Sequence, residues 1–120
     1  MRSNWIEHKG KKIFYQDFSR NFYNAEVVKT ELAEVQKIVK AQAPGSVRVL
    51  SDFRDTNVGS ELLPAMNTAS AATKAYVCKT AVLGVTGMKR RLADLLTALT
   101  GQPLKSFDDI ESAKNWLAED

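Results

Sequence analysis

Thr80-Ala-Val-Leu-Gly-Val-Thr-Gly-Met88 is an uncharged run that is followed directly by three cations, Lys89-Arg90-Arg91. A short apolar run bounded by glycines predicts a buried strand, here from Thr80 to Val85, of the kind found inside parallel sheets. The segment after it predicts a helix, because apolar residues recur at helical spacing at Met88, Leu92, Leu95 and Leu99. A buried strand followed by an amphipathic helix indicates an α/β fold.

The part of the chain around this run is cationic. No acidic residue occurs between Glu61 and Asp94. The three consecutive cations fall in the first turn of the predicted helix, where the macrodipole is already positive, and this costs roughly 0.3 kcal/mol or more. The pattern therefore points to an anion, an anionic surface or an acidic partner, and the alternative is a solvated basic turn. The expected contacts are Lys74, Lys79, Lys89, Arg90 and Arg91.

The N-terminal third predicts a β-hairpin and then a surface helix. Apolar and aromatic residues in Trp5–His8 and Lys12–Phe18 flank the turn Lys9-Gly10-Lys11. Asn24 can cap a helix that ends at Ala43-Pro44-Gly45. The apolar stripe of this helix is Val28, Leu32, Val35 and Val39, widened by Val27 and Ile38.

The remaining segments complete an alternating pattern. Val47–Phe53 is a second strand-like run, and a helix begins near Ser60 or Leu63. That helix is unusual because no residue from Leu62 to Thr73 is charged, so one face is expected on the core and another against something else. Leu104–Phe107 predicts a short edge strand, and Asp108 or Asp109 opens a last helix with the apolar face Ile110, Ala113, Trp116 and Leu117.

The whole chain is expected to form a single α/β domain over residues 1–120, a mixed four- or five-stranded sheet with a parallel centre and helices packed on one side. Its length suits one hydrophobic core, and 44% hydrophobic and 26% charged residues are ordinary for a globular protein. The net charge of +3 is mild for a nucleic-acid binder, and the aromatics lie away from the acid-free segment, so no nucleic-acid partner is expected.

The single Cys78 excludes an intramolecular disulfide and a cysteine-based metal cage. No metal or cofactor is expected. With no apolar run near the ~18 residues of a membrane span, a cytoplasmic location is expected.

Four segments together resemble the SpoIIAA-like family, whose domain is related to STAS domains and to lipid-carrying Sec14 (CRAL-TRIO) domains. They are Lys12-Ile-Phe-Tyr-Gln-Asp-Phe-Ser19, Pro44-Gly-Ser-Val-Arg-Val-Leu-Ser-Asp52, Ala81-Val-Leu-Gly-Val-Thr-Gly-Met88 and Phe107-Asp-Asp-Ile-Glu-Ser-Ala-Lys-Asn-Trp-Leu117. The resemblance implies a four- or five-stranded sheet with helices on one side, a cavity for a nonpolar ligand, peripheral membrane association and homodimers.

STAS proteins that antagonise anti-sigma factors carry an Asp-Ser-Ser-Gly-like phosphorylation loop before the second helix. The matching loop here, Asp55-Thr56-Asn57-Val58-Gly59-Ser60, only echoes that pattern. Thr56 and Ser60 are the phospho-acceptors that this alternative, a protein-interaction switch, would use.

The expected ligand site lies between the second and third predicted helices. Methionine and small side chains repack at little cost, which suits a variable nonpolar guest, and the alternative is an ordinary core. A glycine turn at a strand end would hold an anionic headgroup there, and aromatics of the loop after the hairpin would anchor at a membrane or fix that loop to the core. The pocket would be lined by Leu62, Leu63, Met66, Ala69 and Met88. The glycine turn contributes Gly84, Thr86 and Gly87, and the aromatics are Phe18 and Phe22.

The best constellation for an enzyme is Asp17, Asp52 and Asp55, near the ends of two strands. Paired carboxylates can perform acid–base chemistry. However, the only histidine, His8, lies in the hairpin away from them, and strand-end aspartates commonly cap loops. We therefore expect no catalytic activity. The sequence favours a binding module that carries a nonpolar or amphiphilic small molecule and is peripheral at an anionic membrane.

Overall fold

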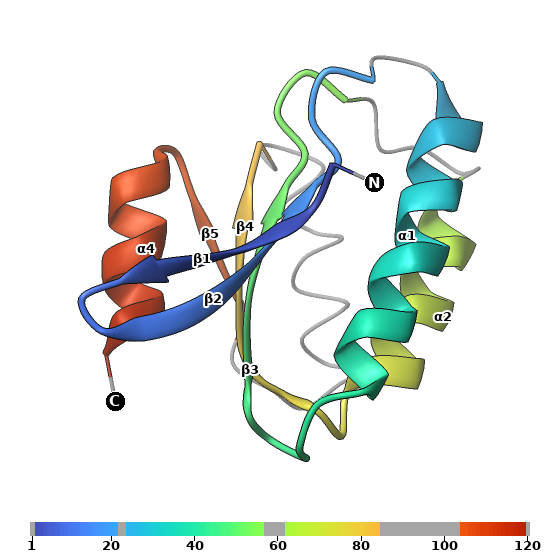
Figure 1. Cartoon of the computed structure of the whole chain (residues 1–120). Helices are drawn as coiled ribbons and strands as arrows, with labels where there is room; N and C mark the ends of the chain where they lie inside the picture. Colours follow the sequence, from blue (N-terminus) through green and yellow to red (C-terminus); the bar gives the residue numbers. More distant parts are fainter. Residues whose placement is uncertain (1, 22–23, 57–61, 85–103, 120) are drawn as a thin grey trace.

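The computed structural model describes residues 2–21, 24–56, 62–84 and 104–119 (Figure 1). These residues form a five-stranded sheet in the order β1-β2-β3-β4-β5, which confirms the predicted mixed α/β class. The strands are β1 (Asn4–His8), β2 (Lys11–Asp17), β3 (Val47–Asp52), β4 (Val77–Leu83) and β5 (Leu104–Phe107), and the helices are α1 (Ala25–Lys40), α2 (Leu63–Thr73) and α4 (Ile110–Ala118).

The sheet has one antiparallel pair and a parallel remainder. β1 runs antiparallel to β2, whereas β2–β3, β3–β4 and β4–β5 are parallel pairs. The hairpin closes through Lys9 (φ 51°) and Gly10 (φ 79°), and two central residues with positive φ define a type I′ turn. The predicted hairpin is confirmed, with its turn shortened to two residues.

α1 forms as its sequence predicts. The side-chain oxygen of Asn24 accepts a hydrogen bond from the backbone N–H of Val27 at 3.4 Å and so caps the helix. All four residues of the predicted stripe are buried (Val28, Leu32, Val35 and Val39). Val27 is 42% exposed, so the predicted widening of the stripe was wrong on that side, although Ile38 does pack against the core.

Helices cover both faces of the sheet, which corrects the expectation that they pack on one side. In Figure 1, α1 and α2 lie on one side of the strands and α4 on the other. The reason is that β3 and β4 carry apolar residues on both faces, as central parallel strands do. One core contains Phe14, Val49, Val82 and residues of α1 and α2, and the second contains Ile13, Leu50, Ala81, Leu83, Ala113 and Leu117.

The later helices begin where the sequence predicts. α2 starts at Leu63 with Pro64 in its first turn, and Asp109 caps α4 by accepting a hydrogen bond from the backbone N–H of Ser112 at 2.7 Å. β4 begins at Val77, earlier than predicted, because Val77 already pairs with Val47. The helix predicted around Leu92 and Leu95 lies outside the described residues. Among the described helices, none combines the length and the apolarity needed to cross a bilayer.

Candidate functional site

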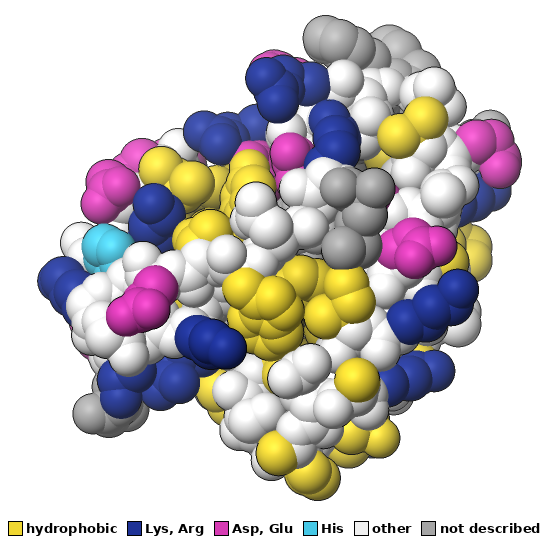
Figure 2. All heavy atoms as spheres, viewed as in Figure 1, with side chains coloured by type: hydrophobic (Ala, Val, Ile, Leu, Met, Phe, Trp, Pro, Cys, Tyr) yellow, Lys and Arg dark blue, Asp and Glu magenta, His cyan; other side chains and the backbone are white. Residues whose placement is uncertain are grey.

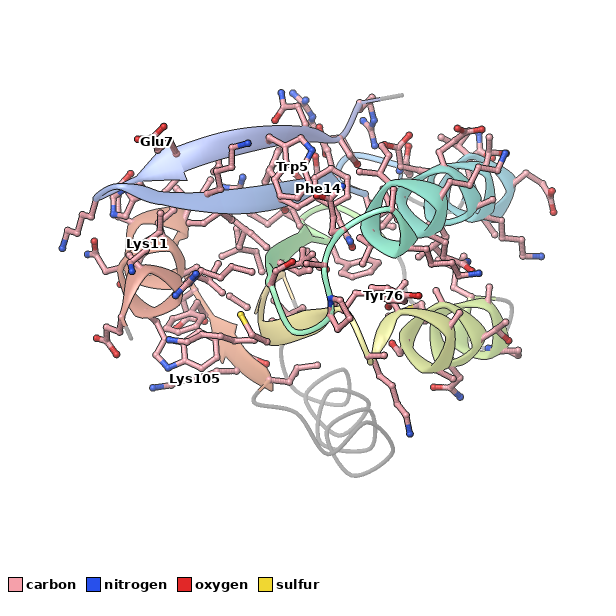
Figure 3. The ribbon with its side chains drawn as sticks, turned by 60° about the horizontal axis from the view of Figure 1, so that its bottom comes forward. Trp5, Glu7, Lys11, Phe14, Tyr76 and Lys105 are labelled. Carbon is pink, nitrogen blue, oxygen red and sulfur yellow. The ribbon has the colours of Figure 1, made fainter. Side chains whose placement is uncertain are left out.

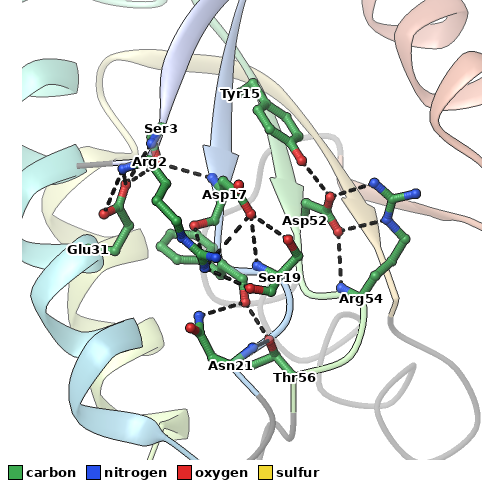
Figure 4. Close-up of polar contacts among 11 residues, drawn as sticks. Arg2, Ser3, Tyr15, Asp17, Ser19, Asn21, Glu31, Asp52, Arg54 and Thr56 are labelled. Carbon is green, nitrogen blue, oxygen red and sulfur yellow. Dashed lines mark hydrogen bonds and ion pairs between the residues drawn. The ribbon is translucent and has the colours of Figure 1, made fainter.

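A network of polar side chains lies at the carboxyl edge of the sheet (Figure 4). The parallel register places Asp17 at the end of β2 directly beside Asp52 at the end of β3. Both aspartates were predicted to lie near neighbouring strand ends. The loops that leave these strands add Ser19, Arg54 and Thr56 to the group.

Asp52 is the most deeply buried acid of this group, with a side chain that is 0% exposed. Arg54 binds it through two nitrogens, Nε at 3.0 Å and Nη2 at 2.7 Å, and the hydroxyl of Tyr15 donates to it at 2.6 Å. Burial alone would raise the pKa of Asp52, but the hydrogen bonds from Arg54 and Tyr15 outweigh burial and hold its pKa below the usual range. Asp52 is therefore a permanently charged acceptor at neutral pH.

The pKa values of Tyr15 and Arg54 are both shifted in the direction that preserves their bonds to Asp52. Burial, and then the hydrogen bond to Asp52, raise the pKa of the Tyr15 hydroxyl. The hydrogen bonds to Asp52 likewise raise the pKa of Arg54. Tyr15 thus keeps its proton and Arg54 its charge at any physiological pH. A tyrosine activated as a base would need the opposite shift.

Asp17 and Glu31 fasten the N-terminal segment and the loop after β2. One oxygen of Asp17 accepts from the backbone N–H of Ser19 at 3.0 Å and from its hydroxyl at 2.6 Å. Glu31 of α1 accepts from the backbone N–H groups of Arg2 (3.1 Å) and Ser3 (2.8 Å) and from the Ser3 hydroxyl (2.5 Å). These carboxylates cap backbone, which is the structural alternative weighed for the strand-end aspartates.

Thr56, the described member of the predicted phospho-acceptor pair, has a buried hydroxyl. It donates to the backbone carbonyl of Phe18 at 2.5 Å and accepts from the backbone N–H of Asn21 at 3.1 Å. Thr56 is only 3% exposed, so a kinase would have to open this loop before it reached the oxygen. Ser60 lies outside the described residues, and phosphorylation at either position stays a prediction.

The chemistry of this edge is that of a structural network. Asp17 and Asp52 are each engaged by two or more donors from their own chain. Asp55 follows in the left-handed region at φ 58°. His8 is bonded to Asn115 of α4 at 2.7 Å, in the hairpin turn region of β1. Within the described residues, no group of three or more metal-ligating side chains is arranged to hold a metal ion.

Replacing Arg54 with alanine is expected to lower the free energy of unfolding by about 2–3 kcal/mol at pH 7, because Asp52 would stay buried with its charge uncompensated. The figure is at the low end for a buried pair, since the Arg54 side chain is 47% exposed and water screens it. Urea unfolding measures the loss. Lys29→Ala, which breaks the more exposed pair of Lys29 with Glu26, is the control and should cost less than about 1 kcal/mol.

The pH dependence of the Arg54→Ala variant tests the same pair. The lowered pKa of Asp52 means that its contribution is full above the unfolded-state value of about 3.9 and is lost as the pH falls through the folded-state pKa. Without Arg54 the pKa of Asp52 rises, so protonation relieves the buried charge at a higher pH. The stability gap to the wild type should therefore narrow as the pH drops towards 3. A gap that is constant with pH would contradict the assignment.

Of the residues predicted to line a ligand site, some are buried in the core and others lie outside the described part of the chain. Phe18 (1% exposed) stacks on Phe53 with ring centroids 5.0 Å apart. Leu62, Met66 and Ala69 are also buried members of the core under α1 and α2. Gly84 directly follows β4 and lies against the backbone of Phe53 and Arg54 in the loop after β3. The side chain of Leu63 and the residues Phe22, Thr86, Gly87 and Met88 lie outside the described part of the chain.

The predicted cationic contacts do not form one surface in the described part of the chain. Lys74 is exposed just after α2. The ammonium of Lys79 instead packs with α4 on the opposite face: it donates to the backbone carbonyls of Trp116 and Glu119, each at 2.8 Å, and lies 4.8 Å from the centre of the Trp116 ring. Lys89, Arg90 and Arg91 lie outside the described residues.

Three polar features of the structure were not predicted from the sequence. The ion pair of Arg54 with Asp52 was not predicted, although the two residues are only two positions apart. The role of Glu31 was not predicted: its side chain is 8% exposed and accepts hydrogen bonds from the N-terminal backbone. Asn67 of α2 has a buried side-chain oxygen with no hydrogen-bond partner in the part of the chain that the structure describes.

No protein-family model, curated protein or solved structure matches this chain.

Proposed function

We propose that this chain is a non-enzymatic binding module that holds a nonpolar or amphiphilic small molecule against α2, and that it works at an anionic membrane surface. The observation that carries the proposal is the low polarity of α2. From Leu62 to Thr73 the helix has no charged residue, although Pro64, Thr68 and Ala71 are exposed. A surface helix without charges is typical of a helix that has something apolar beside it.

Two threonine hydroxyls of α2 are already bonded to backbone carbonyls of the same helix. Thr68 donates to the carbonyl of Pro64 at 2.9 Å, and Thr73 donates to the carbonyl of Ala69 at 2.8 Å. Since both hydroxyls are bonded to their own helix, a guest beside α2 need not satisfy them. The outer surface of the helix therefore suits a hydrocarbon better than its threonine content suggests.

One polar atom gives the guest a second requirement. Within the described residues the buried side-chain oxygen of Asn67 has no hydrogen-bond partner, and leaving such an oxygen unpaired costs roughly 1–3 kcal/mol. A hydrogen-bond donor on an otherwise apolar molecule would recover part of this cost. An amphiphile with a hydroxyl, amide or protonated headgroup fits both requirements. The resemblance to the SpoIIAA-like family suggests the same class of ligand.

Binding of a dansyl-labelled medium-chain fatty acid, followed by its fluorescence, tests the proposal. The wild-type chain should bind the probe saturably, and Ala71→Glu, which places a charge on the exposed side of α2, should weaken binding by about tenfold or more, which is about 1.4 kcal/mol. Val27→Glu adds the same charge to the exposed side of α1 and should bind like the wild type. Circular dichroism of both variants confirms that they are folded.

Flotation with vesicles tests the membrane arm separately. Vesicles that contain anionic phosphatidylglycerol should carry the protein at low salt and release it at high salt, because screening weakens exposed electrostatic contacts. Pure phosphatidylcholine vesicles have no net charge and should not carry it. The proposal is wrong if the probe does not bind, or if Ala71→Glu and Val27→Glu bind it equally. Probe binding without flotation would retain the carrier and discard the membrane surface.

A further inference from the structure

β1 is an edge strand that is open to pairing. It stands at the end of the sheet order, and Asn4, Trp5 and Glu7 are exposed, Trp5 to 37%. Its register with β2 is regular from Asn4 to His8, with no bulge and no proline. Natural sheets usually protect such edges with lysines, prolines, bulges or short strands, because unpaired N–H and C=O groups recruit another strand.

The opposite edge of the sheet is one residue shorter and exposes a lysine, the residue most typical of protected edges. β5 has only 4 residues, and its one strongly exposed side chain is Lys105. The Lys105 ammonium lies over the Phe107 ring, 5.4 Å from its centre. Figure 3 shows the contrast, with Lys105 at the β5 side of the molecule and Trp5 beside Phe14 on the β1–β2 hairpin. The two edges are therefore built differently.

The turn determines which backbone groups of β1 face outward. In a two-residue hairpin the flanking residues, here His8 and Lys11, exchange both backbone hydrogen bonds. Hydrogen-bonded pairs alternate along the strands, so Ile6 and Asn4 also bond inward to β2. The N–H and C=O groups of Trp5 and Glu7 consequently point away from β2, towards the open edge.

We propose that β1 pairs antiparallel with β1 of a second copy of this chain, so that two five-stranded sheets become one continuous sheet. A two-fold axis perpendicular to the sheet keeps each side chain on its own face, so only residues that share a face can lie opposite one another. The axis can therefore pass through a pair of Trp5, Ile6 or Glu7 residues within this strand.

The chemistry selects the pair of Ile6 residues. An axis through Glu7 would place two like charges directly opposite, which destabilises a sheet. An axis through Trp5 would need Ser3 to bond outward to Glu7, but the Ser3 N–H already donates to Glu31 at 2.8 Å. An axis through Ile6 sets Trp5 of each copy opposite Glu7 of the other. All four outward N–H and C=O groups of each strand are then bonded.

The side chains complement one another in this register. Lys12 is opposite Glu7 of its own chain, and its ammonium lies over the Trp5 ring, 5.8 Å from the ring centre. In this register Glu7 of one copy would be opposite Trp5 of the other, beside the ring over which that copy's Lys12 lies. On the opposite face, Ile6 packs against the core formed with α4, and two Ile6 side chains in contact would join the two cores. Figure 2 shows hydrophobic side chains exposed on the molecule between the first hairpin and α1, with cations around them.

Disulfide cross-linking of the full chain tests this register. In a Cys78→Ala background, Ile6→Cys should form a dimer on mild oxidation, because non-hydrogen-bonded opposite residues have Cα atoms about 4.5 Å apart, within disulfide range. Trp5→Cys and His8→Cys are matched controls. Their counterparts lie more than about 7 Å apart in this register, and they should stay monomeric on a non-reducing gel. A cross-link at Trp5→Cys alone would overturn the register.

Sedimentation equilibrium of the unmodified protein tests the dimer itself. We expect a concentration-dependent dimer that Glu7→Lys weakens by about tenfold or more and that the double variant Glu7→Lys/Lys12→Glu restores. Glu26→Lys makes the same charge change on α1 and should leave the dimer intact. A monomer at all concentrations, with Ile6→Cys failing to cross-link, would overturn the proposal. Because α2 takes no part in this contact, neither result bears on the proposed ligand.

Discussion

Replacing Phe18 with alanine is expected to lower the free energy of unfolding by about 3–5 kcal/mol in the ligand-free protein. The side chain is 1% exposed and stacks on Phe53 within the core under α1 and α2. Removing the ring leaves a cavity as well as losing its burial energy. Urea unfolding followed by the circular dichroism of the helices measures the loss.

Phe18→Leu is the matched control, because it keeps most of the volume and should cost less than about 1.5 kcal/mol. The comparison separates two roles that the sequence left open for this aromatic. A ring that lines an open ligand site would be nearly neutral for stability when no ligand is present. If the alanine variant loses less than about 1 kcal/mol, Phe18 lines an open ligand site and is not part of the packed core.

Gly84→Ala is expected to cost about 3 kcal/mol of stability, for two separate reasons. Gly84 has φ +80°, a region in which a side chain adds roughly 1–2 kcal/mol of strain. A Cβ atom there would also lie 2.6 Å from the backbone nitrogen of Arg54 and 2.7 Å from the carbonyl carbon of Phe53, and overpacking of this kind typically costs about 1–3 kcal/mol.

Gly45→Ala isolates the first of these reasons. Gly45 has a similar φ of +67°, but a Cβ atom there would meet nothing within 4 Å. It should therefore show the conformational strain alone, and thermal or urea unfolding of the two variants side by side should give Gly84→Ala the larger loss. Equal losses would mean that the contact between the end of β4 and the loop after β3 is looser than its geometry indicates.

The local elements of this fold could be predicted because their signals are short in range. Asn24 and Asp109 cap the helices that follow them, and the stripe from Val28 to Val39 is buried as its spacing predicts. The turn at Lys9-Gly10 has the positive φ values that glycine-containing hairpins require. The caps and the turn depend on contacts within a few residues, and the stripe can be recognised from the spacing of apolar residues within one segment.

The arrangement of the elements in space was harder to predict. The sequence alone does not determine on which face of the sheet α4 packs, because both faces of the sheet are apolar and an amphipathic helix can cover either one. The same ambiguity affected Lys74 and Lys79, which are close in sequence but are separated by the sheet. Strand alternation around Val82 and Leu83, each in a different core, is the signal that could have shown two covered faces.

The polar edge was predicted in part. Asp17 and Asp52 were placed near neighbouring strand ends, and the parallel register sets them side by side. Their partners could not be foreseen from composition, since Tyr15 and Arg54 reach Asp52 only through the geometry of β2 and the loop after β3. Gly84 shows the same limit, because the backbone beside it belongs to Arg54 and Phe53, which are 30 and 31 positions earlier in the sequence.

The Glu31 contacts have a consequence for the order in which the chain can assemble. The backbone of Ser3 is separated from its acceptor by 28 positions, so the start of the first strand cannot be anchored until the middle of α1 has been synthesised and has coiled. The hairpin can close earlier through its own local turn, yet its outer strand stays tethered only on one side. Until the Glu31 contact forms, the first strand is held in place only by its pairing with β2.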